Sequence, residues 1–341
     1  APSTRIESGE SCKKLYGPYL LYCNSGANAD ELWTDARAKS ATERRAWPYD
    51  WLENAELYPQ KSSRGSVKGH LTIRDPLKPQ LDSAGAWIGL AHPDKGGNWQ
   101  SESKRYQHWS KVDAKGDFEI PNVRPGTYTL YAFTDGAVGE FEQPGANVKP
   151  GLNPTGELVW NVPRVGKSLA WEIGVPDRRA TEFRKGNDYF HGYVWTNFSK
   201  ELKSPLIYTI GKSNPATDWN FAQGAYLVNG KPVSWPWQVH FPLATVPSSG
   251  NARLVIAWAS SESARMEINV NGKSIGRPIY PPNGGGNALL REGIHAKYGL
   301  SQIDIPVSLL KQGNNVLTLT QGRNDSPANH VMYDYLALEM P

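Results

Sequence analysis

The pattern of hydrophobic and polar positions changes once along this chain of 341 residues, from helical to strand-like. Residues 29–46 carry apolar side chains at helical spacing, acidic residues at the start and arginines at the end, which suits the helix dipole. The apolar positions are Ala29, Leu32, Trp33 and Ala36. From residue 64 onward, short runs rich in β-branched and aromatic residues alternate with turn residues. The pattern predicts a mostly β protein with one helix near its start.

Residues 1–63 do not form a domain of their own. Residues 14–22 begin as a strand with a break at Gly17-Pro18, and the residues before them are too few to pair with it. We interpret this run as the last strand of a preceding domain. The apolar face of the helix at 29–46 must dock on something, and an aromatic linker follows it as far as Ser63.

Residues 64–165 predict a small β-sandwich. About seven strands in a hundred residues, separated by turns, are typical of that architecture. The runs are GSVKGHLTI, AWIGLA, YQHWSKV, GDFEI, GTYTLYAF and GELVWNV. No cluster of titratable residues stands out, so we expect this segment to act as a spacer or brace.

Residues 166–341 predict a jelly roll of about eight antiparallel strands, an architecture found in many lectin domains. In one strand Met266, Ile268 and Val270 alternate with polar residues, which indicates one buried and one wet face. Asn271-Gly272 then predicts a type I′ hairpin turn. The strand runs are SPLIYTIG, SWPWQVHF, ARLVIAWA, ARMEINV, SQIDIPV, NNVLTLT and HVMYDYLALE.

Composition narrows the function classes. The net charge of +4 and pI of about 8.8 mildly favour an acidic partner, but the basic residues are scattered singly, which argues against nucleic acid. No apolar run reaches the roughly 18 residues of a membrane span. The 13 Trp and 16 Tyr suit sugar-stacking surfaces as well as sandwich cores. Cys12 and Cys23 fit either a disulfide or two free thiols.

The stretch from Pro281 to Leu300, PPNGGGNALLREGIHAKYGL, combines backbone breakers with many polar groups. Three consecutive glycines allow conformations that a side chain would forbid. A long loop between strands is either a solvated connection or a binding loop. Of the seven histidines, only His295 has a basic and aromatic neighbourhood, so we predict it as a substrate contact together with Arg291.

Other positions carry weaker predictions of sugar binding. Arg178, within VPDRRATEF, either pins a domain junction or binds sugar. Asp218 and Trp219 follow a turn, where the indole could stack on a sugar or cover the core. Asp334 lies on the final strand, where calcium is the one cofactor considered. A single carboxylate falls short of the six to eight oxygens that calcium wants, so we predict no metal ligand and no cofactor.

Several sequence blocks together resemble rhamnogalacturonan endolyases of polysaccharide lyase family 4. The blocks are KKLYGPYLLY, RGSVKGHL, VRPGTYTLYAF, LAWEIGVPDRRATEF, LIYTIGKSNPATDW and LREGIHAKYG. The resemblance implies an N-terminal catalytic β-sandwich, of which residues 1–63 would be the tail with a helix and linker. It also implies a fibronectin type III-like domain at 64–165 and a carbohydrate-binding-like jelly roll of the galactose-binding superfamily at 166–341.

The resemblance also implies which residues act. The family's catalytic lysine and histidine lie upstream of the GPY block, where this chain has sixteen residues and no histidine, so no catalytic residue is assigned. A loop of the third domain is expected to reach the substrate groove. Arg291 and His295 match the two basic positions of that loop. At the second position the family relative has an arginine, where this chain has His295. Tyr298 matches a following tyrosine, and Asn287 lies in the same stretch. A guanidinium can bind both oxygens of a galacturonate carboxylate.

These observations predict a secreted protein whose parent cleaves rhamnogalacturonan by β-elimination. We expect this chain to bind or orient that acidic plant cell-wall polysaccharide, with an N-terminal catalytic fragment or domain as a further partner. One alternative is an active site rebuilt with a partner chain. Another is a stand-alone, non-catalytic carbohydrate-binding or structural cell-wall protein. Nucleic acid and membrane partners are not expected.

Overall fold

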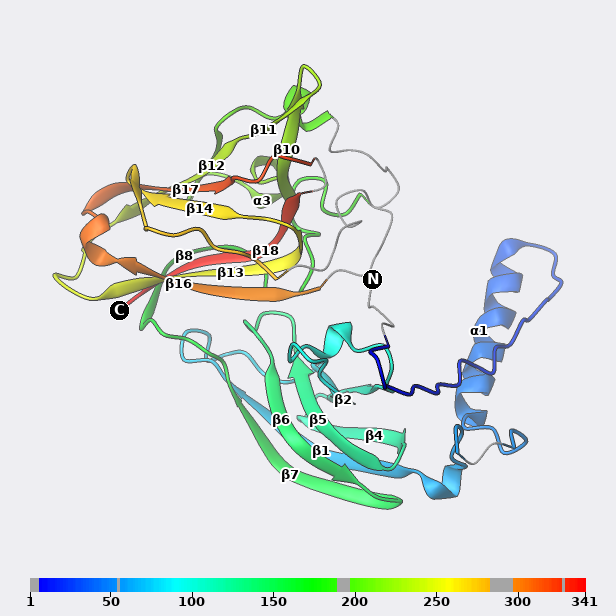
Figure 1. Cartoon of the computed structure of the whole chain (residues 1–341). Coiled ribbons are helices and arrows are strands. Elements are labelled where there is room, and N and C mark those ends of the chain that lie inside the picture. Colours follow the sequence, from blue (N-terminus) through cyan, green and yellow to red (C-terminus); the bar gives the residue numbers. More distant parts are fainter. Residues whose placement is uncertain (1–5, 54–55, 189–196, 283–296, 327–328) are drawn as a thin grey trace.

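The computed structural model describes residues 6–53, 56–188, 197–282, 297–326 and 329–341. Its strands build two β-sandwiches that pack against each other, and helix α1 (Ala29–Ala46) stands to one side (Figure 1). The mostly β fold class predicted from the hydrophobic pattern is confirmed.

Helix α1 has the predicted bounds because its first turn is well capped. The Asn28 side chain accepts from the Glu31 N–H, and the Glu31 carboxylate accepts from the Ala27 N–H at 2.9 Å. None of its residues is buried, and the Trp33 side chain is 63% exposed. Within the described residues, the apolar face of α1 therefore has no docking partner.

The strand predicted at residues 14–22 is wrong for this structure. These residues have no strand assignment, and Tyr19 and Leu21 are more than four-fifths exposed. A strand requires a neighbouring strand to satisfy its backbone groups. The neighbours of this segment are residues 103–106 and helix α1, and no described strand pairs with it.

The first sandwich has a three-stranded sheet in the order β4-β1-β7 and a four-stranded sheet in the order β3-β2-β5-β6. Its core lies between the two sheets and includes Leu71, Ile88 and Trp160. The strands are β1 (Gly65–Arg74), β2 (Trp87–Ala91), β3 (His108–Lys111), β4 (Asp117–Val123), β5 (Gly126–Phe133), β6 (Phe141–Val148) and β7 (Gly151–Asn161).

The second sandwich pairs a sheet in the order β11-β10-β18-β13-β16, with β8 also against β18, and a sheet in the order β15-β14-β17-β12-β9. The strands are β8 (Ser168–Gly174), β9 (Leu206–Thr209), β10 (Ala222–Val228), β11 (Lys231–Ser234), β12 (Pro236–Leu243), β13 (Asn251–Glu262), β14 (Met266–Val270), β15 (Lys273–Ser274), β16 (Gly299–Pro306), β17 (Gly313–Gln321) and β18 (His330–Met340). Short helices are α2 (Phe198–Glu201), α3 (Pro215–Asp218), η1 (Lys61–Ser63), η2 (Trp99–Ser101) and η4 (Val307–Leu309).

The predicted alternation and hairpin turn are confirmed in β14 and β15. Met266, Ile268 and Val270 are buried while Glu267 is exposed. Asn271 and Gly272 both have positive φ, as a type I′ turn requires. The antiparallel arrangement expected for residues 166–341 is wrong in one place, since β9 pairs with β12 in parallel. In the first sandwich, β1 also pairs with β7 in parallel.

The two sandwiches share one apolar interface. Val255 and Ala257 of β13 and Tyr335 and Ala337 of β18 belong to the core cluster of the first sandwich, although their strands lie in the second. Every residue of β18 is buried, because one face of its sheet covers the jelly-roll core and the other meets the first sandwich.

A buried ionic network joins the connection between the sandwiches to both of them. The Arg164 guanidinium donates to both carboxylate oxygens of Asp75, after β1, and to Glu339, on β18, at 2.9–3.2 Å. All three side chains are fully buried. Burial by itself lowers the pKa of Arg164. The hydrogen bonds that Arg164 donates to Asp75 and Glu339 have the larger, opposite effect, so its pKa lies above the usual value.

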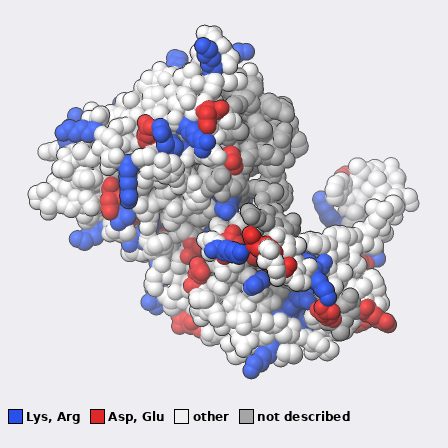
Figure 2. Space-filling view, viewed as in Figure 1, with Lys and Arg blue, Asp and Glu red and all other residues white. Residues whose placement is uncertain are grey.

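The surface is mixed in charge. On the face in Figure 2, Lys and Arg alternate with Asp and Glu over both sandwiches, and no broad stripe of one sign covers the described residues. Cys12 and Cys23 are free thiols. No helix among the described residues has the length and apolar content to cross a membrane.

We expect Arg164→Met to lower the free energy of unfolding by about 3–5 kcal/mol, because Asp75 and Glu339 would stay buried without their counterion. Arg179→Met is the matched control, since the Arg179 side chain is 55% exposed in its ion pairs with Asp135 and Asp177 and should lose no more than about 1 kcal/mol. Urea denaturation measures both variants. Equal losses would show that burial of the network does not hold the sandwiches together.

Candidate functional site

The predicted binding stretch leaves the second sandwich and returns to it at one point. Arg291, His295 and Asn287 lie outside the described residues. The described residues on the two sides of them, Pro282 and Gly299, are close together. A Cβ added to Gly299 would lie 2.5 Å from the Pro282 ring. The Ser261 hydroxyl also donates to the Pro282 carbonyl. Loops whose ends meet in this way are frequently functional.

Tyr298, at the C-terminal end of that stretch, lies in the junction between the sandwiches. Its ring is 8% exposed, its hydroxyl accepts from the Gly139 N–H at 3.2 Å, and its backbone N–H donates to Gln100. Burial raises the pKa of the hydroxyl well above its usual value. As placed, Tyr298 anchors the stretch to the first sandwich and has almost no surface to offer a sugar.

Arg178 lies against the same tyrosine. Its guanidinium carbon is 4.3 Å from the Tyr298 ring centroid and 4.0 Å from that of Phe133, and Nη2 pairs with Glu140 at 2.8 Å. Of the two sequence interpretations, the structure gives Arg178 the role of pinning the junction.

Trp219 is a core residue, so its predicted stacking on a sugar is wrong in this structure. Its side chain is 0% exposed and makes edge-to-face contacts with Trp237 at 4.9 Å and Tyr333 at 5.2 Å. Asp218, at the end of α3, is exposed and accepts from the Asn214 N–H at 2.8 Å. That bond closes a local turn, and the two side chains do not form a common sugar site.

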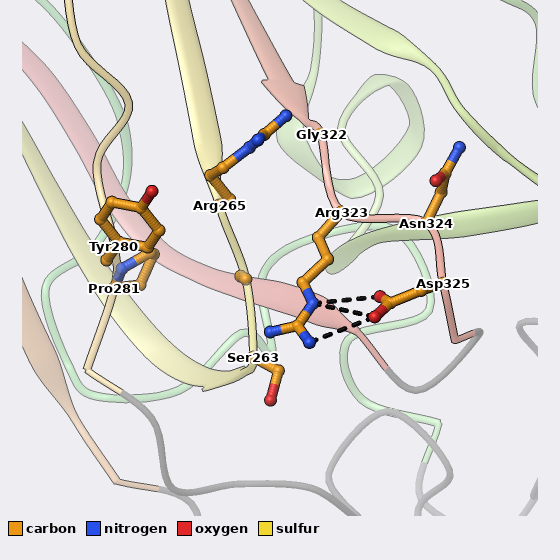
Figure 3. A pocket seen from close by; sticks show the side chains of 9 residues that line it. Ser263, Arg265, Tyr280, Pro281, Gly322, Arg323, Asn324 and Asp325 are labelled. Carbon is orange, nitrogen blue, oxygen red and sulfur yellow. Dashed lines mark hydrogen bonds and ion pairs between the residues drawn. The ribbon is translucent and has the colours of Figure 1, made fainter.

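A cavity of about 520 Å³ lies at the same end of the second sandwich as the predicted stretch. Tyr280, just before the stretch, and Pro281, its first residue, form one wall. The loop after β17 forms the other, with Arg265 between them (Figure 3). The lining residues are Ser263, Ala264, Arg265, Tyr280, Pro281, Gly322, Arg323, Asn324 and Asp325.

The chemistry of this cavity is an exposed aromatic ring beside two ion pairs. Tyr280 is 69% exposed. Arg323 binds Asp325 through Nε and Nη2 at 3.0–3.2 Å, which lowers the pKa of that carboxyl. Arg265 Nη2 lies 2.7 Å from Glu267, while its Nε is buried and has no hydrogen-bond partner among the described residues. The wall therefore offers a ring face for stacking, with two guanidinium groups beside it.

Buried Gln321 fixes the loops that carry these arginines. Its Nε2 donates to the Arg323 carbonyl at 2.6 Å, and its Oε1 accepts from the Arg323 N–H at 2.7 Å and the Arg265 N–H at 3.4 Å. The sequence analysis missed this site because its residues come from three separate segments. Pairing of β14 with β17 and the bridge between Met266 and Ile279 bring those segments together.

Asp334 is the residue at which calcium was considered. Its Oδ1 accepts from the backbone N–H groups of residues 177, 178 and 179 at 2.8–3.2 Å. Burial raises the pKa of its carboxyl well above the usual value, and the negative charges of Asp177 and Glu182 add to that effect. Its Oδ2 and Glu182 Oε2 are buried without a hydrogen-bond partner among the described residues.

Two carboxylates fall short of the six to eight oxygens that calcium takes. No group of three or more His, Cys, Asp or Glu side chains able to hold a metal occurs in the part of the chain that the structure describes. Asp334 caps the 177–179 turn through its hydrogen bonds with these three N–H groups.

Comparison with known proteins yields two family matches. Residues 83–155 match polysaccharide lyase family 4, domain II, and residues 169–338 match polysaccharide lyase family 4, domain III. The matched regions lie in the first and second sandwich respectively.

Full-length relatives agree with these matches. Rhamnogalacturonate lyase of Dickeya dadantii is 30% identical over 334 residues, which cover 96% of this chain and 52% of the relative. Probable rhamnogalacturonate lyase B of Aspergillus niger is 26% identical over 355 residues, which cover 90% of this chain and 48% of the relative. The chain thus spans about half the length of these relatives.

Among solved structures, a family 35 carbohydrate binding module from Clostridium thermocellum aligns at 24% identity with a TM-score of 0.22, over 32% of this chain and 70% of the module. The two domain matches and the full-length relatives cover nearly the whole sequence. This chain belongs to polysaccharide lyase family 4, of which it carries domains II and III.

Proposed function

We propose that this chain binds and orients an acidic polysaccharide, rhamnogalacturonan, for cleavage by β-elimination in the longer protein. The observation that carries the proposal is the cavity in which exposed Tyr280 lies beside Arg265 and Arg323, at the base of the Pro281–Leu300 stretch. Relatives that bear the name rhamnogalacturonate lyase support this choice of polymer.

The chemistry of the cavity supports a sugar. An aromatic face stacks on the C–H face of a pyranose ring, and charge-assisted donors from arginine bind hydroxyl or carboxylate oxygens. Both arginines are already paired with carboxylates, so the wall is close to neutral and unsuited to a phosphate backbone, which needs a basic stripe. Tyr280 and Pro281, which line this cavity, precede Arg291 and His295 in the sequence.

The partner in cleavage is the part of the relatives that this chain does not span. Helix α1 has no buried residue, and Tyr19, Leu21 and Trp33 are all more than 60% exposed. Large apolar side chains that stay exposed are typical of a protein contact when they lie in one region, and these three lie in the N-terminal segment and α1. We propose that it meets an N-terminal catalytic domain and that the complete protein is secreted, where its polymer occurs.

We expect Arg265→Gln to weaken binding of rhamnogalacturonan oligosaccharides by about 10- to 100-fold, because a charge-assisted hydrogen bond contributes about 1.5–3 kcal/mol. Tyr280→Ala removes the stacking face and should weaken binding by about 3- to 10-fold. Arg291→Ala should also weaken binding. Isothermal titration calorimetry and Trp fluorescence measure the affinities.

Lys231→Gln is the matched control for these variants, since Lys231 begins β11 and is not among the residues that line the cavity. Unchanged affinity in both the Arg265 and Tyr280 variants would reject this cavity. Absence of any heat or fluorescence change with the unaltered protein would favour a structural cell-wall role.

We expect the chain by itself to produce no unsaturated uronate ends from rhamnogalacturonan, because none of the described carboxylates, lysines or histidines forms an acid-base cluster in the cavity. Ultraviolet absorbance of the products measures this reaction. Accumulation of unsaturated ends would instead support an active site built within this chain.

We propose that Asp334 acts without a bound metal and predict that Asp334→Asn raises the melting temperature at pH 8. The pKa of the Asp334 carboxyl in the folded protein lies above the ordinary value of 3.8, so the folded protein binds this proton more tightly than the unfolded chain does. Stability therefore falls as the pH rises from 3.8 to the pKa of the folded state. Asparagine keeps the acceptor and removes the buried charge, for a gain of at least about 1 kcal/mol at pH 8 and little at pH 4.

Differential scanning calorimetry with calcium or with a chelator tests the metal-free role. We expect neither addition to change the melting temperature of the unaltered protein. A calcium-dependent increase that Asp334→Asn abolishes would assign Asp334 to a metal site.

A further inference from the structure

The first sandwich has a second, smaller cavity that lies far from the candidate site in sequence. It has a volume of about 150 Å³ and is bounded by the N-terminal segment, the linker before β1, strand β3 with the residues before it, and the turn between β4 and β5. The lining residues are Leu15, Gly17, Trp47, Leu57, Tyr58, Arg64, Tyr106, Gln107, His108 and Arg124. Its walls combine cationic and aromatic side chains.

Two guanidinium groups line this cavity, and neither has a carboxylate partner among the described residues. Arg64, which is 6% exposed, donates to the carbonyls of Pro59 and Asn122 at 2.8 and 3.0 Å. Arg124 donates to the carbonyls of Leu57 and Glu56 at 2.7 and 3.3 Å. An arginine has five N–H donors, so each retains donors that these bonds leave unused.

Aromatic rings hold the guanidinium planes in place. The Arg64 guanidinium carbon lies 4.9 Å from the Trp47 ring centroid and 5.3 Å from that of Tyr58. The Arg124 carbon lies 4.1 Å from the centroid of Tyr106. Stacked guanidinium groups keep their edges free for planar, bidentate acceptors such as carboxylates.

A polar atom without a partner also lies in this cavity wall. His108 Nε2 is buried and has no hydrogen-bond partner among the described residues. Burial and the positive charges of Arg64, Arg124 and His92 lower the pKa of His108 to about 4. At neutral pH the imidazole is therefore uncharged, and Nε2 donates or accepts one hydrogen bond according to the tautomer.

The Glu102 carboxylate makes no ion pair with Arg64 or Arg124 among the described residues. Glu102 acts electrostatically on Lys14 and His92, and its Oε1 accepts from the backbone N–H groups of Lys104 and Arg105. Burial and the positive charge of Arg124 lower the pKa of Arg64. Among the described groups with a main effect on this pKa, only tyrosines raise it. The local field is positive and uncompensated, which favours an anion.

We propose that this cavity on the first sandwich binds the carboxylate of a single acidic sugar residue through Arg64, Arg124 and His108, with Trp47 and Tyr106 against the ring. A volume of about 150 Å³ suits one sugar ring rather than a polymer segment. The choice of a sugar as the carrier of the carboxylate rests on the function proposed above, whereas the anion site does not.

The test uses the full chain and D-galacturonate, with D-galactose and sulfate as comparison probes. Nuclear magnetic resonance follows the His108 imidazole through a pH titration with each probe. We expect galacturonate to raise the pKa of His108 by at least one unit and galactose to leave it unchanged. If galacturonate leaves the His108 titration unchanged, the proposed site is wrong. If sulfate binds with the same affinity as galacturonate, the site binds anions but does not select a sugar.

A matched pair of variants separates charge from folding. Leu15 lines the cavity from the N-terminal segment, outside the strands. Leu15→Glu places a competing carboxylate beside the arginines and should weaken galacturonate binding by at least tenfold, whereas Leu15→Gln should not. Equal binding by the two variants would reject a cationic site.

Arg124→Gln provides a second measurement, because glutamine can still donate to the Leu57 carbonyl while the charge is lost. We expect at least tenfold weaker binding at His108 and no change at the Tyr280 cavity. Arg265→Gln should show the reverse. This pairing distinguishes failure of the His108 site from failure of the polysaccharide site near Tyr280.

Discussion

The arrangement of the two sandwiches depends on the buried pairing of Arg164 with Asp75 and Glu339. Arg164 lies in the interdomain connection, Asp75 just after β1, and Glu339 on the last strand, β18. The network therefore forms only when the two folded domains are in contact. A guanidinium is suited to this position because its planar fork satisfies two carboxylates at once. Glu339 also accepts from the backbone N–H groups of residues 165 and 166, so the connection itself is held rigidly.

This fixed junction determines where the polar loops lie. Tyr298 is bonded to Gly139 and Gln100 of the first sandwich, while Pro282, at the other end of the same stretch, contacts Gly299 and Ser261 of the second. The stretch with Arg291 and His295 is thus anchored to both domains at its base. Anchors at both ends lower the conformational entropy that the residues between them can lose on binding a ligand.

The sequence predicted those parts of the fold that depend on local periodicity. Helix α1, the alternation in β14 and the Asn271-Gly272 turn were readable because their causes lie within a few residues. Edge strand β6, with the polar sequence FEQPGANV, was not recognised, since its pairing with β5 rather than its composition makes it a strand. Trp219 was ambiguous for a similar reason, because only the tertiary fold decides whether an indole after a turn is covered.

Functional side chains were harder to predict because topology rather than spacing brings them together. Arg265, Tyr280 and Arg323 lie on three segments, and Arg64 and His108 meet across two sheets of the first sandwich. One physical signal was nevertheless present in the composition: a net charge of +4 with basic residues scattered singly. Scattered cations pair with local carboxylates on a folded surface. Arg64 and Arg124 have no carboxylate partner among the described residues, and for this reason we propose them as ligands of an external anion.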